Sequence, residues 1–353
     1  MNGAAQDSKK EGGIFIVWRR YQGRVDAMQS FFGYEPRYFG FSYPYRCLRP
    51  LEYLRKSMAT YVDLKKRRPS RLWIQMPPTP LLYVGALYKK MNPGTCLVAD
   101  CHCSIVWPPW CKFPQFLRLM NRAVDVIILH NSFAYEEALA FGMDQSRCVL
   151  LEDRPAETSP EPERQWDSPL SYPRPWVLFA ASFDLDEPID ALLAAARLIP
   201  DVTFVVTGDV RRAQGRHDLS CLPPNVHLTG WLDRARYKRL LLEADAIVGL
   251  TAIEGIQMSI ANEAVGYGKA MVLSGTAIMK ELFPTGAVYV ESEDRSVADG
   301  IKTAIENRSV LEAESRELRT ERVRRWTGQA RNMQERLARA ENVGSAASGG
   351  LRK

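Results

Sequence analysis

The sequence predicts an α/β fold made of two similar halves joined by a linker. Strand-like and helix-like segments alternate along most of the chain, which is typical of parallel sheets covered by helices. With 353 residues, the chain is longer than a single hydrophobic core usually supports. A polar stretch rich in proline, residues 155–175, separates two alternating series and predicts an exposed linker. We therefore expect one half over residues 13–154 and the other over 176–309.

Short apolar runs predict the strands, and longer amphipathic runs predict the helices. In the first half the strands are expected at Ile14–Trp18, Arg71–Gln75, Cys96–Ala99, Val124–Leu129 and Cys148–Leu151. The helices between them are expected at Leu51–Lys66, Leu81–Lys90, Pro114–Arg122 and Phe133–Phe141.

The second half repeats the alternation. Its strands are expected at Trp176–Ala180, Val202–Thr207, Val226–Leu228, Ala246–Leu250 and Ala270–Leu273. Its helices are expected at Ile189–Leu198, at Arg236–Glu243 and from an N-cap at Ser259 to Gly266 and Gly268. A further helix is expected over residues 310–341, which are rich in Glu, Arg, Leu and Ala. Residues 1–12 and 342–353 are expected to be disordered.

The composition argues against a membrane-spanning, secreted or nucleic-acid-binding protein. The hydrophobic content of 46% is ordinary for a globular chain, and no apolar run approaches the ~20 residues that span a bilayer. The first residues lack the apolar core of a secretory signal, so we expect a cytoplasmic protein. Seven cysteines, an odd number, argue for reduced thiols. The net charge of +6 comes without a nucleic-acid-binding motif, so no nucleic-acid partner is expected.

Four cysteines near His102 raise the question of zinc: Cys96, Cys101, Cys103 and Cys111. Their spacings do not form paired C-x-x-C knuckles. Cys96 also lies in an expected strand, where neighbouring side chains point to opposite faces of the sheet. We therefore expect no metal site.

The most informative segment, Thr251–Gly275, carries two acidic residues around a predicted helix start. Glu254 lies on the loop after a buried strand, and Glu263 lies about one turn inside the following helix. Ligands bind at the carboxyl edge of an open parallel sheet, and a helix N-terminus favours an anion such as a pyrophosphate. The segment therefore predicts a site for an anionic ligand.

At these residues the chain resembles the retaining nucleotide-sugar glycosyltransferases of the GT-B architecture, family 4-like (glycosyl transferases group 1). The resemblance implies two Rossmann-like domains facing a cleft, with the donor nucleotide-sugar on the second domain. It implies that Glu254 is catalytic and meets the donor-sugar hydroxyls, and that Glu263 meets the ribose. Eight residues separate the two glutamates, where the family usually has seven. The other donor-binding positions that it implies are Gly255, Gln257, Ser259 and Asn262.

Two glycine turns precede these glutamates. Gly208 follows one predicted strand, and Gly230, with Trp231 beside it, ends another. The resemblance places the second turn beside the nucleobase, through main-chain contacts. We therefore expect all three residues to belong to the donor site.

One turn departs from the family pattern. Ser182 and Glu187 stand where the family usually has an Arg and a Lys that contact the donor diphosphate. Three explanations stay open. The helix start near Ser259 and backbone N–H groups neutralise the phosphates, cations come from the other half, or donor binding has been lost. We count Ser182 among the donor-binding residues on the first two.

The first half offers such cations. Arg19, Arg20 and Arg24 follow its opening strand, and guanidinium groups suit bidentate recognition of phosphate. We expect them to bind the donor diphosphate or an acceptor phosphate; the alternative is ordinary surface charge. His102 follows another strand, with Asp100 placed to fix its tautomer. In similar transferases a histidine there faces the transferred sugar, which implies a catalytic role; the alternative is a structural histidine.

The expected function is transfer of a sugar from a nucleoside diphospho-sugar to a carbohydrate or lipid-linked acceptor, with retention. The resemblance implies front-face attack assisted by the leaving phosphate, without a metal or other cofactor. It also implies a C-terminal helix that crosses to the first domain, anchored by Trp326; a solvent-exposed charged helix and a dimerisation arm are the alternatives. Residues 46–71 mix cations with apolar residues. They fit either a helix on an anionic membrane surface, giving peripheral contact at the inner face, or a helix packed on the sheet. A nucleotide-sugar 2-epimerase and a non-catalytic GT-B scaffold remain as alternatives.

Overall fold

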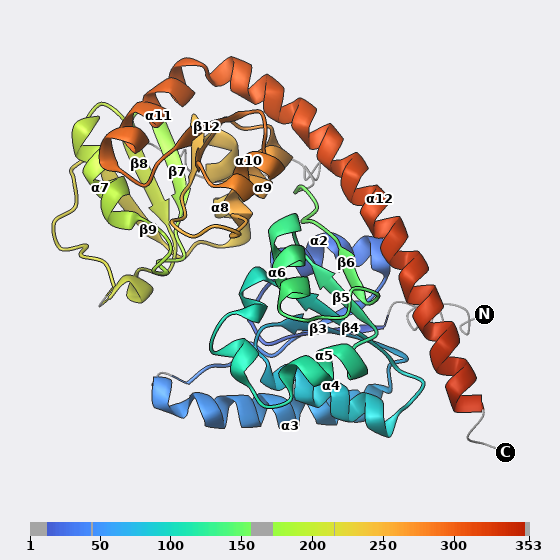
Figure 1. The fold of residues 1–353 in the computed structure, drawn as a ribbon. Coiled ribbons are helices and arrows are strands. Elements are labelled where there is room, and N and C mark those ends of the chain that lie inside the picture. The colour runs from blue at the N-terminus through green and yellow to red at the C-terminus, as the bar shows by residue number, and fades with distance from the viewer. Residues whose placement is uncertain (1–12, 44, 157–171, 215, 350–353) are drawn as a thin grey trace, which may run out of the picture. The chain divides into compact units, whose positions relative to one another are not determined.

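The structure is a computed structural model and describes residues 13–43, 45–156, 172–214 and 216–349. The chain divides into two compact units, Met1–Arg154 with Arg325–Lys353, and Pro155–Arg324, here called unit 1 and unit 2. Each unit holds one six-stranded sheet with helices packed on it (Figure 1). The segment 1–12 and most of the expected linker lie outside the described residues.

All the strand pairs of unit 1 are parallel, in the order β2-β1-β3-β4-β5-β6. The chain order reverses between β1 and β3, so the carboxyl ends of these strands form the switch point where open α/β sheets bind ligands. The strands are β1 (Ile14–Val17), β2 (Glu35–Tyr38), β3 (Arg71–Met76), β4 (Cys96–Cys101), β5 (Val126–Leu129) and β6 (Cys148–Leu150). The helices are α2 (Gly23–Phe32), α3 (Arg49–Arg67), α4 (Pro80–Met91), α5 (Phe116–Ala123) and α6 (Ser132–Ala140), with short 3-10 turns η1 (Arg46–Leu48), η2 (Cys103–Val106) and η3 (Trp110–Lys112).

Unit 2 has a parallel sheet of the order β12-β11-β10-β7-β8-β9, with its switch point between β7 and β10. Its strands are β7 (Trp176–Ala180), β8 (Thr203–Thr207), β9 (Val226–Gly230), β10 (Ala246–Gly249), β11 (Met271–Ser274) and β12 (Ala287–Val290). Its helices are α7 (Ile189–Leu198), α8 (Arg234–Glu243), α9 (Ser259–Tyr267), α10 (Ala277–Leu282) and α11 (Asp294–Glu306), with the 3-10 turn η4 (Val210–Ala213). The last helix, α12 (Arg308–Gly349), begins in unit 2 and ends in unit 1, and it runs past the expected end at residue 341.

Among the described residues, three α-helices and two strands were not expected from the sequence: α2, α10, α11, β2 and β12. β2 reads Glu-Pro-Arg-Tyr, and its charges and proline are tolerated because it is an edge strand. α10 has only six residues, too few to show a helical period. The helix α2 places Arg24 in its first turn rather than on a loop.

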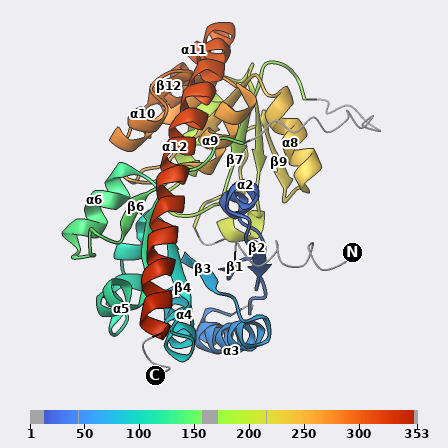
Figure 2. The ribbon, with the colours of Figure 1, turned by 90° about the vertical axis from the view of Figure 1, so that its right-hand side faces the viewer.

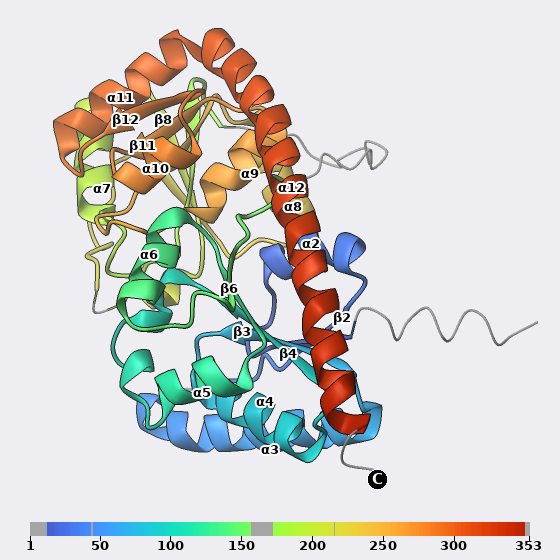
Figure 3. The ribbon, with the colours of Figure 1, turned by 45° about the vertical axis from the view of Figure 1, so that its right-hand side comes forward.

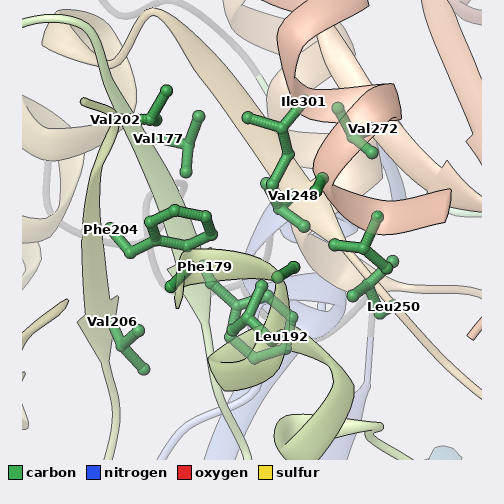
Figure 4. Close-up of a cluster of buried hydrophobic side chains, with 14 of the residues drawn as sticks. Val177, Phe179, Leu192, Val202, Phe204, Val206, Val248, Leu250, Val272 and Ile301 are labelled. Atoms are coloured by element: carbon green, nitrogen blue, oxygen red, sulfur yellow. The ribbon is translucent and has the colours of Figure 1, made fainter. Parts of the chain in front are cut away.

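The cores lie against strands that are buried on both faces, as in other parallel sheets. In unit 2, side chains of β7, β8 and β10 pack with Leu192 of α7 and Ile301 of α11 (Figure 4). The labelled strand residues of this core are Val177, Phe179, Phe204, Val206, Val248 and, on β11, Val272.

The C-terminal part of α12 completes the core of unit 1. Its buried residues recur every three or four positions, so they form one stripe, and they join the cluster that contains Phe15 and Trp73. Figure 2 and Figure 3 show this part of α12, in red, lying along the sheet of unit 1. The stripe consists of Trp326, Ala330, Met333 and Leu337. Among the described residues, no helix is both long and apolar enough to cross a bilayer.

Candidate functional site

Most of the residues expected to bind the donor lie after β7 and β10, the two strands at the switch point of unit 2, whereas Gly208 follows β8 and Gly230 ends β9. The turn after β7 and the loop after β10 are fastened together by Asp186. Its carbonyl oxygen accepts a hydrogen bond from the Ala252 N–H at 2.7 Å, and its carboxylate accepts one from the Thr251 hydroxyl at 3.4 Å. Both segments lie at carboxyl ends of adjacent strands, where an anionic ligand of this fold would be expected.

Glu254 lies on the loop after β10, and its side chain is exposed. Its carboxylate accepts hydrogen bonds from the backbone N–H groups of Ala277 (2.9 Å), Ile278 (3.0 Å) and Gly255 (3.1 Å). Desolvation opposes ionisation, but these N–H groups and the charge of Lys280 hold the pKa of Glu254 below its usual value. Glu254 is therefore an ionised group held at the start of α10.

Glu263 lies on α9 and is partly buried. Its carboxylate accepts a 2.5 Å hydrogen bond from the hydroxyl of Tyr237 on α8. Burial raises the pKa of Glu263, although Tyr237 and Arg234 oppose the shift. The tyrosine fixes the orientation of the carboxylate, and sequence reasoning missed it because 26 residues separate the pair.

Four residues between these two glutamates were expected to bind the donor: Gly255, Gln257, Ser259 and Asn262. Met258, not Ser259 as expected, is the N-cap of α9, because Met258 has the extended backbone and Ser259 already lies in the helix. Gly255 has a positive φ of 83°, and Asn262 is buried on α9. Both side-chain amide atoms of Gln257 are buried and have no hydrogen-bonding partner among the described residues. Such an amide is destabilising by about 1–3 kcal/mol unless a ligand or water satisfies it.

The turn after β7 holds an internal carboxylate where a diphosphate was expected. The buried carboxylate of Glu187 accepts hydrogen bonds from the N–H groups of Ser182 (2.9 Å) and Phe183 (2.8 Å). Burial raises its pKa. The same turn carries Asp184, which forms ion pairs with Arg212 at 2.7 Å and Arg216 at 2.6 Å. These two arginines follow β8, and the run Val210–Ala213 with Arg216 was the sequence signal that we overlooked.

Gly208 and Gly230 differ in whether packing around them requires a glycine. Gly208 has φ +146°, and a Cβ there would lie 2.1 Å from the carbonyl oxygen of Ala181. Its glycine is therefore explained by the close approach of two strand ends, which needs no ligand. Gly230 has φ +71° with open space around it, and the side chain of the next residue, Trp231, is 79% exposed.

In unit 1, Arg24 is not available to bind phosphate, contrary to expectation. Its side chain is buried, with ion pairs to Asp100 at 3.1 Å and to Asp153 at 2.5 Å. Its remaining donors reach the carbonyl oxygens of Leu151 and Glu152. Every donor nitrogen of this guanidinium is used inside the protein, so Arg24 joins β4 to the chain after β6.

His102 is held by different residues from the one expected. Its Nε2 lies 3.1 Å from the amide nitrogen of Gln22 and 3.0 Å from that of Gln75. With both amides donating, Nε2 accepts and Nδ1 carries the proton. Burial lowers the pKa of His102 to about 3, and the charges of His130 and Arg19 add to the shift while Asp100 opposes it. His102 is therefore neutral at physiological pH.

Asp100 does not orient His102. It accepts from Nε2 of His130 at 3.0 Å and pairs with Arg24. Burial opposes ionisation, but Arg24 and His130 hold the pKa of Asp100 well below its usual range. Arg19 and Arg20 are exposed and come one residue after the end of β1, a strand at the switch point of this sheet.

No protein-family model matches the chain, and no curated protein is similar to it in sequence. Solved structures do resemble it. HepE from Anabaena, crystallised with UDP and glucose, has a TM-score of 0.66 at 13% identity, over 92% of this chain and 98% of that one. A UDP-forming α,α-trehalose-phosphate synthase from Burkholderia xenovorans has a TM-score of 0.63 at 14% identity, over 96% and 97%. A Listeria monocytogenes structure whose assigned activity is UDP-N-acetylglucosamine 2-epimerase has a TM-score of 0.55 at 14% identity, over 86% and 90%.

These structural similarities identify the fold of the chain. The two parallel six-stranded sheets correspond to the two Rossmann-like domains of GT-B proteins. The chain has the GT-B fold.

Proposed function

We propose that this protein is a glycosyltransferase that uses a nucleoside diphospho-sugar as donor and a carbohydrate or a lipid-linked sugar as acceptor, with retention of configuration. The observation that carries the proposal is the group of unsatisfied and oriented polar side chains at the switch point of unit 2. Gln257 has a buried amide without a partner, and Glu263 is fixed by Tyr237. The Anabaena and Burkholderia structures, named for UDP complexes and a UDP-forming reaction, support the choice of donor class.

In this proposal the nucleoside binds along α8, α9 and the end of β9. Glu263 accepts hydrogen bonds from the ribose hydroxyls, because a carboxylate that Tyr237 already orients loses little freedom on binding. The exposed indole of Trp231 stacks on the base. Gly230 leaves room for the base to approach the main chain, since nothing lies near its Cα.

The diphosphate needs positive charge, and unit 2 offers two sources. The first N–H groups of α9, at Ser259 and beyond, favour an anion. Arg212 and Arg216, attached to the donor turn through Asp184, supply guanidinium groups next to Ser182. Stabilising the leaving diphosphate in this way lowers the barrier to transfer without a metal ion. Among the described residues, no three His, Cys, Asp or Glu side chains cluster as metal ligands do.

Each unit offers one residue for a sugar hydroxyl in this proposal: Glu254 in unit 2 and His102 in unit 1. Glu254 stays ionised and accepts hydrogen bonds from sugar hydroxyls with the lone pairs that the α10 N–H groups leave free. Neutral His102 donates from Nδ1 to a sugar hydroxyl, because Gln22 and Gln75 occupy Nε2. Arg19 and Arg20 bind an acidic group of the acceptor.

Calorimetry with a panel of UDP-, GDP- and dTDP-sugars tests the proposal. We expect one nucleotide class to bind, and the Gln257→Ala variant to weaken that binding. The matched control is Gln145→Ala, which truncates a glutamine of unit 1 far along the chain from the proposed donor site. If no donor binds to the unmodified chain, the transferase assignment fails.

One observation favours a non-catalytic scaffold as the second candidate. Glu187 fills the backbone N–H groups that would otherwise meet a phosphate, and Asp184 neutralises the two nearby arginines. Absence of donor binding is the result that this candidate predicts. The likeness to the Listeria structure supports a 2-epimerase as a further alternative. An epimerase would convert a bound donor without an acceptor, so product analysis distinguishes it from a transferase.

A further inference from the structure

The outward side of α3 carries an apolar stripe that no described part of the chain covers. Four residues spaced three or four positions apart lie on one side of this helix, and each is at least half exposed: Leu51 (50%), Leu54 (57%), Met58 (62%) and Val62 (66%). Figure 1 shows α3 at the edge of unit 1, next to α4. Single exposed apolar residues are common, but a continuous stripe marks a contact surface.

The opposite side of α3 is fixed to unit 1, so the helix cannot simply roll inward. Leu64 is fully buried in the core. Thr60 accepts a hydrogen bond from the indole of Trp18 at 2.9 Å, and the ammonium of Lys56 donates to the carbonyl oxygen of Trp18 at 3.3 Å. The sequence could not settle which side of the helix faces the sheet, because both sides carry apolar residues.

The stripe is one wall of an open groove of about 680 Å³. Phe39 and Tyr43, from the segment before α3, form the other wall. Most of the lining surface is apolar, and Arg55, Asp63 and Lys66 also line the groove. We call the four stripe residues together with Phe39 and Tyr43 the α3 groove.

The net charge around the α3 groove is positive because both acidic residues of α3, Glu52 and Asp63, form ion pairs with neighbouring cations. Glu52 pairs with Lys56 at 2.7 Å. Asp63 pairs with Arg37 at 3.2 Å and with Arg67 at 3.0 Å. The exposed charges that remain on the outward side are cations.

Three such cations flank the stripe. Arg55 and Lys66 line the groove, and Lys65 lies on the same side of the helix. The Arg55 guanidinium lies 4.6 Å from the ring centroid of Phe41. An apolar stripe of Leu, Met and Val flanked by Lys and Arg is typical of helices that lie in the plane of an anionic bilayer surface. Lysine is depleted at the centre of protein–protein interfaces, so charge and composition both favour the lipid.

We propose that the α3 groove docks unit 1 onto the surface of an anionic phospholipid bilayer. The stripe enters the region between head groups and acyl chains, and Arg55, Lys65 and Lys66 contact the lipid phosphates. The helix lies on the membrane and does not cross it. This inference does not depend on transferase activity, since vesicle binding by a chain that binds no nucleotide-sugar would still support it.

Flotation of the full chain with vesicles tests the proposal. We expect binding to vesicles of phosphatidylcholine mixed with phosphatidylglycerol, weak binding to phosphatidylcholine alone, and loss of binding as salt is raised. Met58→Glu should weaken binding by more than about tenfold, because it places a carboxylate where an apolar side chain enters the lipid. Lys66→Gln should weaken it about fivefold.

Met91→Glu is the matched control. Met91 lies on α4, is also 62% exposed, and does not line the groove. It should bind vesicles as the unmodified chain does. Circular dichroism and thermal unfolding of both variants establish that the fold is kept. The proposal is overturned if the unmodified chain binds no vesicles, or if Met58→Glu binds them as well as Met91→Glu does. Binding to acidic proteins without binding to vesicles would likewise overturn it in favour of a protein partner.

Discussion

The carboxylate of Glu187 accepts a 2.8 Å hydrogen bond from the backbone N–H of Phe183, inside the turn that we propose meets the donor phosphates. Phe183 has a positive φ of 54°, an unusual conformation for a residue other than glycine. The buried side chain of Glu187 thus holds a turn that presents its N–H groups to the protein's own carboxylate. Because the Glu187 carboxylate already accepts hydrogen bonds from these N–H groups, we expect it to oppose the binding of an anionic ligand to the turn.

Glu187→Gln should tighten the binding of UDP about fivefold. The substitution removes a negative charge beside the phosphates, and a charge a few ångströms away is worth about 1 kcal/mol even in water-like surroundings. Calorimetry measures the affinity. Asp190→Asn, which removes an exposed charge on α7, is the control and should change little. Unchanged or weaker binding by Glu187→Gln would exclude this turn from the phosphate site.

Glu254→Gln should lower turnover by about tenfold or more while the protein stays folded. The amide has one acceptor oxygen for the N–H groups of Ala277 and Ile278 and one donor that repels them, so the free energy of unfolding should fall by about 1 kcal/mol. Steady-state rates and urea unfolding measure the two effects. Glu306→Gln, at an exposed position of α11, should change neither. Full activity in Glu254→Gln would remove this carboxylate from the reaction.

The stability that Glu254 provides should depend on pH. Its pKa in the folded protein lies below the usual 4.5, so its contribution is complete above that value and is lost as the pH falls through the lowered pKa. The difference in free energy of unfolding between the unmodified chain and Glu254→Gln should therefore shrink between pH 6 and pH 3. A difference that grows on acidification would contradict the lowered pKa.

Tyr237→Phe should weaken UDP binding about fivefold, because the Glu263 carboxylate loses the hydroxyl that orients it, a bond worth about 1 kcal/mol. Binding of a UDP analogue that lacks both ribose hydroxyls should be equally weak in both proteins. This comparison isolates the ribose contact from general loosening of α8. If the substitution weakens both ligands alike, Tyr237 serves the structure of unit 2 and not the ribose.

Substitutions of Arg24 and Arg20 should have different effects, because Arg24 stabilises the fold and Arg20 is proposed to bind the acceptor. Arg24→Ala leaves the buried carboxylate of Asp100 without its ion pair and should lower the free energy of unfolding by about 3–5 kcal/mol. Arg20→Ala, at an exposed position, should change stability by less than about 0.5 kcal/mol and weaken binding of the acceptor. Chemical denaturation and acceptor KM measure the two effects. A stable Arg24→Ala protein would contradict the network described here.

The α/β alternation could be predicted because strands buried on both faces are continuous apolar runs. β7 was placed to the residue for this reason. α7 was placed to the residue because its apolar positions follow a helical period. β2 could not be predicted, because its sequence lacks apolar alternation and its position depends on pairing with β1. The pattern of Glu254 and Glu263 located the switch point of unit 2, but only the fold revealed what their carboxylates contact.

The buried polar network of unit 1 could not be predicted because its members are far apart in sequence. Arg24 and Asp100 are 76 residues apart, and Arg24 and Asp153 are 129 apart. An arginine after a strand predicts a surface charge unless such partners are known. The same limit applies to His102, whose partners Gln22 and Gln75 come from two other segments.

The route of α12 has a consequence for dissecting the protein. An expressed fragment that stops at Arg154 would lack Trp326, Ala330, Met333 and Leu337, and the aromatic side chains of Phe15 and Trp73 would meet water where those four now pack. Such a fragment should aggregate. Supplying residues 325–342 as a separate peptide, or fusing them ahead of Gly13 in a circular permutant, should restore its solubility.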